Sequence, residues 1–265
     1  MDLIVVAGDI LDLQDDGGTV NQILRFDRCI SAIRATGTNI VFTSGNHDLV
    51  TDGNEAVAPS QRLSEILSRQ NWWDAMSAPA DGCSGAVVTP GQASVISGAA
   101  GEKIVVSAHP FQVEPNPEID SSLWRVAARL RRANQCAWLA LHHVPPSGSA
   151  VGERELRVDD GLRECIEHWC PNFLASGHMH DRPFEDTGSW HDKVAGTLCL
   201  NAGFSYHAAI PNHIVIDTKK LTAEWFSQRS PKGKGEKMKI VVFETSPVYP
   251  SQLRDDVLGR TNIFR

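Results

Sequence analysis

Side chains that could bind a metal ion or move a proton follow four separate apolar segments of the chain. They are Asp9, Asn46, His47, Asp48, His142, His143, His178 and His180. Imidazole nitrogens combined with carboxylate and amide oxygens are ligands that divalent Mn, Fe, Zn or Ni accepts, whereas Mg and Ca favour oxygen alone. The sequence therefore predicts a transition-metal site.

Each of these groups, taken alone, has an ordinary structural explanation. Asp9 could cap the turn after its strand, Asn46 could occupy a left-handed turn, and single histidines at strand ends are commonly hydrogen-bonded structural residues. The motifs GD, GNHD, HH and GHMH nevertheless occur in order, each after an apolar segment. This combination favours one shared site.

The residues between the motifs predict alternating strands and helices. Residues 3–7 are typical of a strand, 19–35 have apolar residues at helical spacing, and 39–43 are typical of a second strand. The crossover of such a βαβ unit is right-handed and its strands are parallel, so both strands should end at the same rim of the sheet. The same order recurs, with helices expected at 60–76, 122–133 and 159–169 and strands at 136–143 and 172–176.

Composition argues against two classes of function. The 265 residues are 42% hydrophobic and 22% charged, as in soluble globular proteins, and no apolar run is as long as a membrane span. The net charge of −7 opposes broad binding to nucleic acid, which needs a concentrated basic face. A basic cluster, Arg125, Arg129, Arg131 and Arg132, alternates with apolar residues and is expected to be the solvent side of a helix.

The cysteines and the first residues favour a cytoplasmic protein. The six cysteines show no CxxC spacing and lie mostly in apolar segments, so we expect buried free thiols. Residues 1–3 carry no basic region ahead of an apolar stretch, so we expect a core strand here and no signal peptide.

The four motifs resemble those of the calcineurin-like metallophosphoesterase superfamily. The matching positions are Gly8-Asp9, Gly45-Asn46-His47-Asp48, His142 and Gly177-His178-Met179-His180. The resemblance covers residues 1–228 and implies an α/β fold, a four-layer α-β-β-α sandwich, with 229–265 as a linker and short C-terminal extension.

The resemblance also implies a role for each motif residue. Asp9 would bridge two metal ions, Asn46, His142 and His178 would complete the shell of one of them, and His180 would bind the other. His47 would face the substrate phosphate, where an imidazole can donate a proton at neutral pH, and Asp48 would orient it.

The choice among neighbouring histidines rests on position in the sequence. His142 directly follows the apolar run "LAL" and matches the family's ligand position, whereas His143 would lean toward the substrate or the wall of the site. His109 also follows an apolar run and is the second choice for this ligand, but we expect it to be structural or to line the pocket.

One motif of the family has no counterpart in this sequence. The family's first strand ends in Asp-x-His and supplies two ligands to the metal that His180 would bind, and no such run occurs here. We therefore expect the fold to lack its first strand. Only the metal site of Asp9, Asn46, His142 and His178 would then have a full set of protein ligands. A misassigned start or a shortened chain is the preferred explanation, because the other motif residues are intact.

The activity implied is hydrolysis of a phosphate ester by metal-activated hydroxide. The run "GDILD" with "GNHD" differs from that of phosphoprotein phosphatases and favours a phosphodiester or a small-molecule phosphoester, with Mn a suitable metal and nucleic acid a less favoured substrate. The alternative is a degenerate, non-catalytic module that binds a phosphorylated ligand or a protein partner. The sequence sets no oligomeric state.

Overall fold

Strands and helices alternate along the computed structural model, which describes residues 2–11, 18–48, 85–111, 117–152, 160–205, 208, 210–218, 220, 222–227 and 239–242. The strands are β1 (Leu3–Val6), β2 (Asn39–Phe42), β3 (Val87–Val88), β4 (Ala93–Ser97), β5 (Lys103–His109), β6 (Ala137–His142), β7 (Phe173–Ser176), β8 (His191–Val194), β9 (Thr197–Asn201), β10 (His213–Asp217), β11 (Thr222–Phe226) and β12 (Lys239–Val242). The helices are α1 (Gly18–Ala35), α3 (Pro117–Asn134) and α4 (Asp160–Trp169), with a 3-10 turn η2 (Arg182–Phe184).

The described strands form three sheets. The first has the order β1-β2-β3 and is parallel, and the third has the order β10-β11-β12 and is antiparallel. The second is mixed, with the order β4-β5-β6-β7-β9-β8, in which β5, β6, β7 and β9 are parallel and β4 and β8 are antiparallel edge strands. The predicted α/β class and the parallel βαβ unit, β1-α1-β2, are confirmed.

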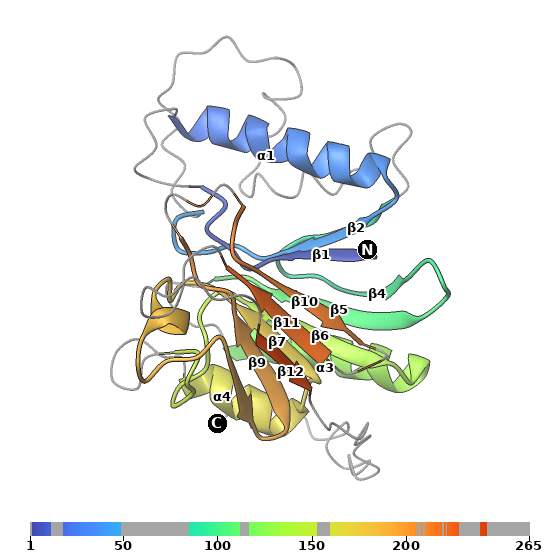
Figure 1. Cartoon of the computed structure of the whole chain (residues 1–265). Coiled ribbons are helices and arrows are strands. Elements are labelled where there is room, and N and C mark those ends of the chain that lie inside the picture. Colours follow the sequence, from blue (N-terminus) through green and yellow to red (C-terminus); the bar gives the residue numbers. More distant parts are fainter. Residues whose placement is uncertain are drawn as a thin grey trace.

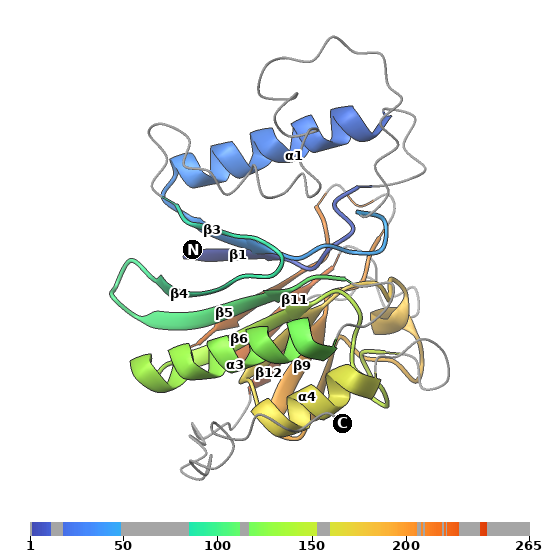
Figure 2. The ribbon, with the colours of Figure 1, turned by 180° about the vertical axis from the view of Figure 1, so that it is seen from behind.

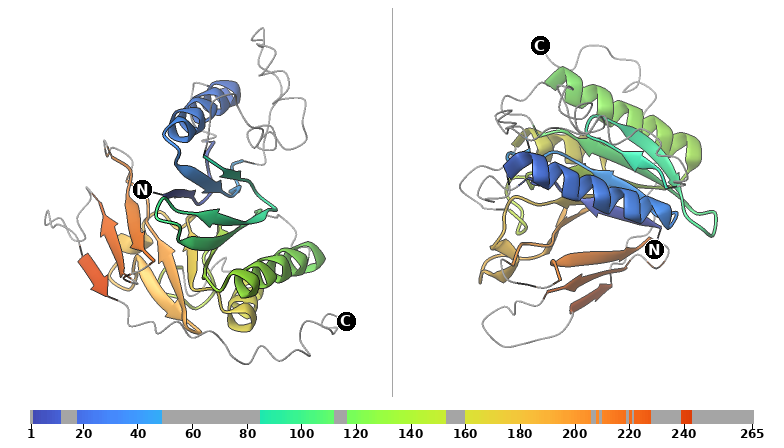
Figure 3. Two further views of the ribbon diagram at one scale, coloured as in Figure 1. Left: turned by 90° about the vertical axis from the view of Figure 1, so that its right-hand side faces the viewer. Right: turned by 90° about the horizontal axis from the view of Figure 1, so that it is seen from above.

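The two sheets that contain parallel strands lie between the helices. Figure 2 shows α1 outside the β1-β2-β3 sheet, and α3 and α4 outside the six-stranded sheet on the opposite side of the molecule. The small β10-β11-β12 sheet lies beside them, as Figure 1 and the two views in Figure 3 show. Buried residues of all three sheets, among them Val41, Leu141 and Trp225, share one hydrophobic cluster.

Strand β6 is buried on both faces, and its side chains alternate between two cores. Leu139 and Leu141 belong to the cluster between the sheets, whereas Trp138 and Ala140 belong to the cluster under α3 and α4. This alternation is the ordinary period of a strand. Any polar residue at the end of β6 therefore faces one core or the other according to its parity.

The helices bury apolar faces, as their sequence patterns predict. Helix α1 packs Ile23 and Ile30 on β2, and Phe26 contacts Phe42 edge to face with ring centroids 5.4 Å apart. No helix in the described ranges has the length and apolarity that crossing a membrane requires.

The basic cluster on α3 differs from the prediction at one residue. Arg129 and Arg132 are exposed, but Arg131 is buried and donates from its guanidinium to the Cys170 carbonyl at 2.8 Å. This carbonyl follows the end of α4, where a cation satisfies an orphan helix acceptor. The helical repeat predicts which residues lie on the solvent side of α3, but it does not predict which long side chain on that side bonds to the end of the neighbouring helix.

The cysteines also depart from the expectation of burial. In the described ranges none forms a disulfide, but Cys199 alone is buried and Cys29 is exposed. Burial raises the pKa of the Cys199 thiol to about 12, so this thiol is inert. Cys83 and the helix expected at 60–76 lie outside the described residues.

Two expectations about the ends of the domain stay predictions. These are the absent first strand and the boundary at residue 228. Strand β12, from the expected extension, pairs with β11 from Thr222↔Val242 to Trp225↔Lys239.

Truncation of the core between the sheets should destabilise the protein strongly. Leu139→Ala removes a side chain that is 3% exposed, and we expect a loss of about 2–4 kcal/mol in the free energy of unfolding, because a cavity is left. The matched control is Val126→Ala on α3, which is 44% exposed and should change stability by less than about 0.5 kcal/mol. Urea unfolding followed by circular dichroism measures both, and equal losses would contradict the assignment of this core.

Candidate metal centre

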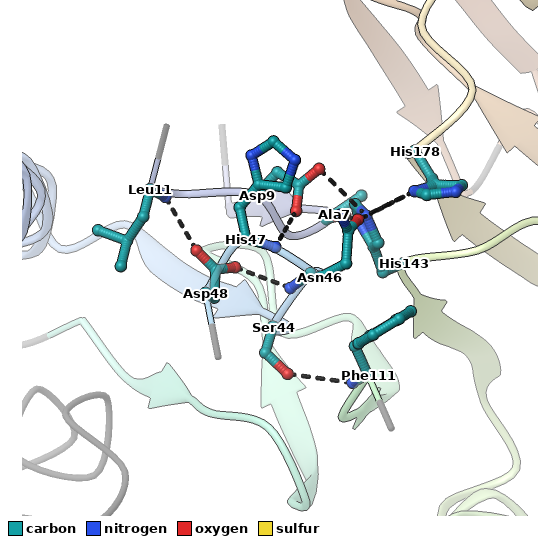
Figure 4. Close-up of polar contacts among 11 residues, drawn as sticks. Ala7, Asp9, Leu11, Ser44, Asn46, His47, Asp48, Phe111, His143 and His178 are labelled. Carbon is teal, nitrogen blue, oxygen red and sulfur yellow. Dashed lines mark hydrogen bonds and ion pairs between the residues drawn. The ribbon is translucent and has the colours of Figure 1, made fainter. Parts of the chain in front are cut away.

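The motif loops converge at the carboxyl ends of the parallel strands. Asp9 follows β1, residues 45–48 follow β2, His143 follows β6, and His178 follows β7. Figure 4 shows the side chains of Asp9, Asn46, His143 and His178 gathered at the junction of the two sheets. The expectation that the first two loops share one rim is confirmed, and the third and fourth loops meet them there.

Four potential ligand atoms lie within contact distance at this junction. His143 Nε2 lies 3.2 Å from Asp9 Oδ2 and 3.0 Å from Asn46 Oδ1. His178 Nδ1 lies 3.0 Å from the same Asn46 oxygen and 3.3 Å from His143 Nε2. Asp9, His143 and His178 form the one group in the described chain whose carboxylate and imidazole donor atoms are close enough for a shared metal.

The hydrogen bonding of His143 directs its second ring nitrogen into this group. His143 Nδ1 lies 2.7 Å from the Ala7 carbonyl oxygen, which can only accept, so Nδ1 carries a proton. The other ring nitrogen, Nε2, therefore faces the donor group, where it lies close to Asp9 Oδ2 and Asn46 Oδ1.

The spacing of the donor atoms fits a first-row divalent metal. Bonds of about 2.1 Å to imidazole and carboxylate place neighbouring ligand atoms about 3.0 Å apart at octahedral angles and about 3.4 Å apart at tetrahedral angles. The observed separations of 3.0–3.3 Å fall in this interval. The Ala7 contact of His143 also resembles the outer hydrogen bond that orients metal-binding histidines.

The Asp9 carboxyl is held in its charged form. Partial burial would raise its pKa, but the hydrogen bond and charge of His143, with the backbone hydrogen bond and charge of His47, outweigh burial and lower the pKa below its ordinary value. The His47 backbone N–H donates to Asp9 Oδ1 at 3.1 Å. Asp9 therefore presents a second oxygen, Oδ2, to the donor group as an anion.

His143, and not His142 as the resemblance implied, contributes a ring nitrogen to the donor group of the described chain. The His142 Nδ1 lies 2.8 Å from the Val144 carbonyl oxygen and its ring is buried away from the donor group. The physical reason is the alternation of β6: His143 has the parity of Leu139 and Leu141, which face the space between the sheets, whereas His142 has the parity of the residues under the helices.

Asp48 fixes the backbone of two motif loops. Its oxygens accept hydrogen bonds from Leu11 N at 2.9 Å and Gly45 N at 2.7 Å, and its side chain is 1% exposed. Burial raises the pKa of Asp48, although both amide hydrogen bonds oppose this shift. These contacts tie the loop after β1 to the loop after β2, and the expected role of orienting His47 stays a prediction.

A comparison with protein families identifies the chain. The model of the calcineurin-like phosphoesterases matches residues 1–182. The chain belongs to this family. Members are metal-dependent phosphoesterases, and the Asp9, His143 and His178 group could hold such a metal.

Solved structures of low identity resemble the chain as well. One is GAP50, the anchor in the inner membrane complex of Plasmodium, with 10% identity, a TM-score of 0.43, and coverage of 92% of this chain and 89% of that chain. Another is the purple acid phosphatase PPD1 from yellow lupin (Lupinus luteus) seeds, with 12% identity, a TM-score of 0.46, and coverage of 91% of this chain and 46% of that chain. No curated protein matches the chain.

Two histidines of this calcineurin-like chain lie apart from the donor group. His180 contacts Phe204, with ring centroids 5.2 Å apart, and its role as a ligand of a further metal stays a prediction. His109 is fully buried on the helix side of β5, stacks on Trp124 at 4.2 Å and contacts Ser107 Oγ through Nε2 at 3.1 Å. A structural role for His109 agrees with these contacts.

Phe111 is a neighbour of the site that the motifs did not reveal. Its ring meets His143 edge to face with centroids 5.9 Å apart, and its backbone N–H donates to Ser44 Oγ at 3.0 Å. No local pattern marks this residue. Its position two residues beyond His109, at the end of a parallel strand, is the one feature of the sequence that indicates a place near the site.

Loss of the Asp48 carboxylate should destabilise the fold. Asp48→Ala leaves the N–H groups of Leu11 and Gly45 buried without acceptors, so we expect the free energy of unfolding to fall by about 2–4 kcal/mol. The matched control is Asp217→Ala, since Asp217 accepts from the exposed Lys220 backbone and should cost less than about 1 kcal/mol. Chemical denaturation in EDTA measures both, and a loss at Asp48 no larger than at Asp217 would contradict the loop-fixing role.

Proposed function

We propose that the chain hydrolyses a phosphate ester with the help of a divalent metal ion held by Asp9, Asn46, His143 and His178. The observation that carries this proposal is the convergence of four donor atoms from four loops: four of their pairwise separations are 3.0–3.3 Å, and the atoms of Asp9, His143 and His178 all lie within 4.8 Å of one another. Each of these atoms comes from a different loop, so one ion bound among Asp9 Oδ2, Asn46 Oδ1, His143 Nε2 and His178 Nδ1 would contact all four loops.

The donor set favours a transition metal. Two imidazoles, one carboxylate and one amide oxygen suit Mn, Fe, Zn or Ni better than Mg or Ca, which prefer oxygen. A bound metal would supply Lewis acidity toward phosphoryl oxygens and lower the pKa of a coordinated water.

His47 is the proposed proton donor to the leaving oxygen. Its backbone is fixed by the hydrogen bond to Asp9 Oδ1, and its imidazole is partly exposed beside the Asp9 carboxylate (Figure 4). An imidazole is suited to proton transfer near neutral pH, because its unperturbed pKa lies close to that pH. Asp48 supports this role indirectly, since it fixes the backbone of the loop that carries His47.

Charge supports a phosphodiester or a small-molecule phosphoester as the substrate. One carboxylate among four donors leaves a divalent ion with net positive charge, which attracts the anionic phosphoryl group. The net charge of −7 opposes a long polyanion, so nucleic acid remains the less favoured substrate.

A non-catalytic module that binds a phosphorylated ligand is the second candidate. The observation that favours it is the position of His180 beside Phe204, apart from the group that could hold a metal. In this case the donor group would bind a metal and an anion without turnover. Hydrolysis and metal binding, measured separately, distinguish the two candidates.

Replacement of His47 should reduce turnover without loss of metal. With Mn²⁺ and bis(p-nitrophenyl) phosphate, we expect His47→Ala to lower kcat by about 10²- to 10⁴-fold, because a general acid is removed. Mn²⁺ affinity, measured by isothermal titration calorimetry, should stay near that of the unmodified chain. Equal metal loss would contradict the role of His47, and metal binding without hydrolysis by the unmodified chain would favour the second candidate.

The adjacent histidines at the end of β6, His142 and His143, provide a matched test of the ligand set. His143→Ala removes a proposed ligand and should weaken Co²⁺ binding by more than about 100-fold, beyond the usual effect of residues behind the ligands. His142→Ala alters the same residue type one position away and should change the affinity by less than about 5-fold, because its ring faces the Val144 carbonyl. A larger loss of Co²⁺ affinity in His142→Ala than in His143→Ala would contradict this ligand set and identify His142 as the ligand.

A further inference from the structure

The turn that carries His178 has a backbone conformation that needs outside support. His178 has φ of +62°, in the left-handed region that non-glycine residues rarely adopt. The next residue closes the turn tightly, since Met179 N donates to the Gly177 carbonyl at 2.6 Å. Such conformations cost about 1–3 kcal/mol and persist where the surroundings determine them.

Asn201, at the end of β9, lies against this turn. The residue pairs with Ser176, the last residue of β7, and is 1% exposed. Its amide nitrogen donates to the Met179 carbonyl at 3.0 Å and to the Val151 carbonyl at 3.3 Å. The carbonyl that directly follows His178 is therefore held by a buried side chain from a neighbouring strand.

The residues that follow Asn201 hold the next carbonyl of the turn. Asn201 Oδ1 accepts from Gly203 N at 2.9 Å, and Phe204 N donates to the His180 carbonyl at 2.9 Å. Gly203 has φ of +66°, and a Cβ there would lie 2.8 Å from the His180 oxygen. A glycine is required for this close approach.

The other end of the turn is fixed to a neighbouring loop of the site. Gly177 N donates to the His143 carbonyl at 2.9 Å, so the start of the turn is bound to the residue that supplies the other imidazole. Asn201 then determines the exit of the turn. His178 lies between these two fixed points, so they determine where its side chain leaves the backbone. Its Nδ1 lies 3.0 Å from Asn46 Oδ1.

We propose that Asn201 is a positioning residue that sets the direction of His178 toward the metal through its hydrogen bond to the Met179 carbonyl. The inference rests on the metal binding in the proposed function. An amide is required because the position needs two donors and one acceptor in one planar group. Aspartate keeps the acceptor for Gly203 and loses both donors, which makes it a nearly isosteric test.

The probe is Co²⁺ alone, added to the metal-free full chain. Calorimetry gives the affinity and visible absorption reports the ligand geometry. We expect Asn201→Asp and Asn201→Ala to weaken Co²⁺ binding by about 10- to 100-fold, as for residues that orient ligands, and to change the visible band. Gly203→Ala should act in the same direction without altering Asn201, because it displaces the His180 carbonyl.

Thr197→Val is the matched control. Thr197 lies on the same strand, is fully buried and donates to the Pro171 carbonyl at 2.7 Å, at the opposite end of β9 from the turn. The variant loses one buried hydrogen bond and should keep the Co²⁺ band and an affinity within about 3-fold. Thermal unfolding in EDTA identifies the variants that are folded, and the comparison uses those.

The outcomes separate this inference from the proposed function. If the unmodified chain binds no Co²⁺, the proposed metal site is wrong and the inference with it. If it binds Co²⁺ and the folded Asn201 and Gly203 variants keep its affinity and visible band, the positioning role alone is overturned. An equal effect of Thr197→Val would also overturn it, because general destabilisation would then explain the loss.

Discussion

The contact between His143 and the Ala7 carbonyl connects the two sheets at the site, and the remaining geometry depends on it. His143 extends from the end of β6 in the six-stranded sheet, and Ala7 follows β1 in the three-stranded sheet. One ring nitrogen is used in this contact, so the other is directed toward Asp9, Asn46 and His178. The same contact explains Gly8, because a Cβ there would lie 2.6 Å from His143 Nδ1. The glycine of the first motif therefore makes room for the histidine of the third.

Much of this arrangement is predictable from the sequence. Parallel strands bring their carboxyl ends to one rim, so the order of apolar runs and polar motifs is enough to place Asp9 and Asn46 together. The choice between His142 and His143 is not predictable in this way. Both faces of β6 are covered by apolar residues, so the sequence of this strand does not show an alternation between buried and exposed positions. The packing of Leu141 in the structure shows which face meets the other sheet.

Contacts between distant segments explain the other differences. Asp48 follows His47 directly and looks like its partner, but its carboxylate accepts hydrogen bonds from the backbone of Gly45 and of Leu11, which is 37 residues away. Phe111 and Asn201 lie outside every motif, yet the first contacts His143 and the second holds the turn after His178. Motifs identify the residues that do chemistry more readily than those that hold them, because supporting contacts depend on the tertiary fold.

Two residues of the donor group have strained backbone conformations that destabilise the folded state. Asp9 and His178 both have positive φ, at +51° and +62°, and each such residue costs about 1–3 kcal/mol. Hydrogen bonds from the His47 and Leu11 backbones and from the Asn201 side chain hold the loops in place despite these costs. A cation that binds this donor group would bind the folded chain and not the unfolded one, so metal binding and the stability of this rim would be thermodynamically linked, as they are at metal sites in general.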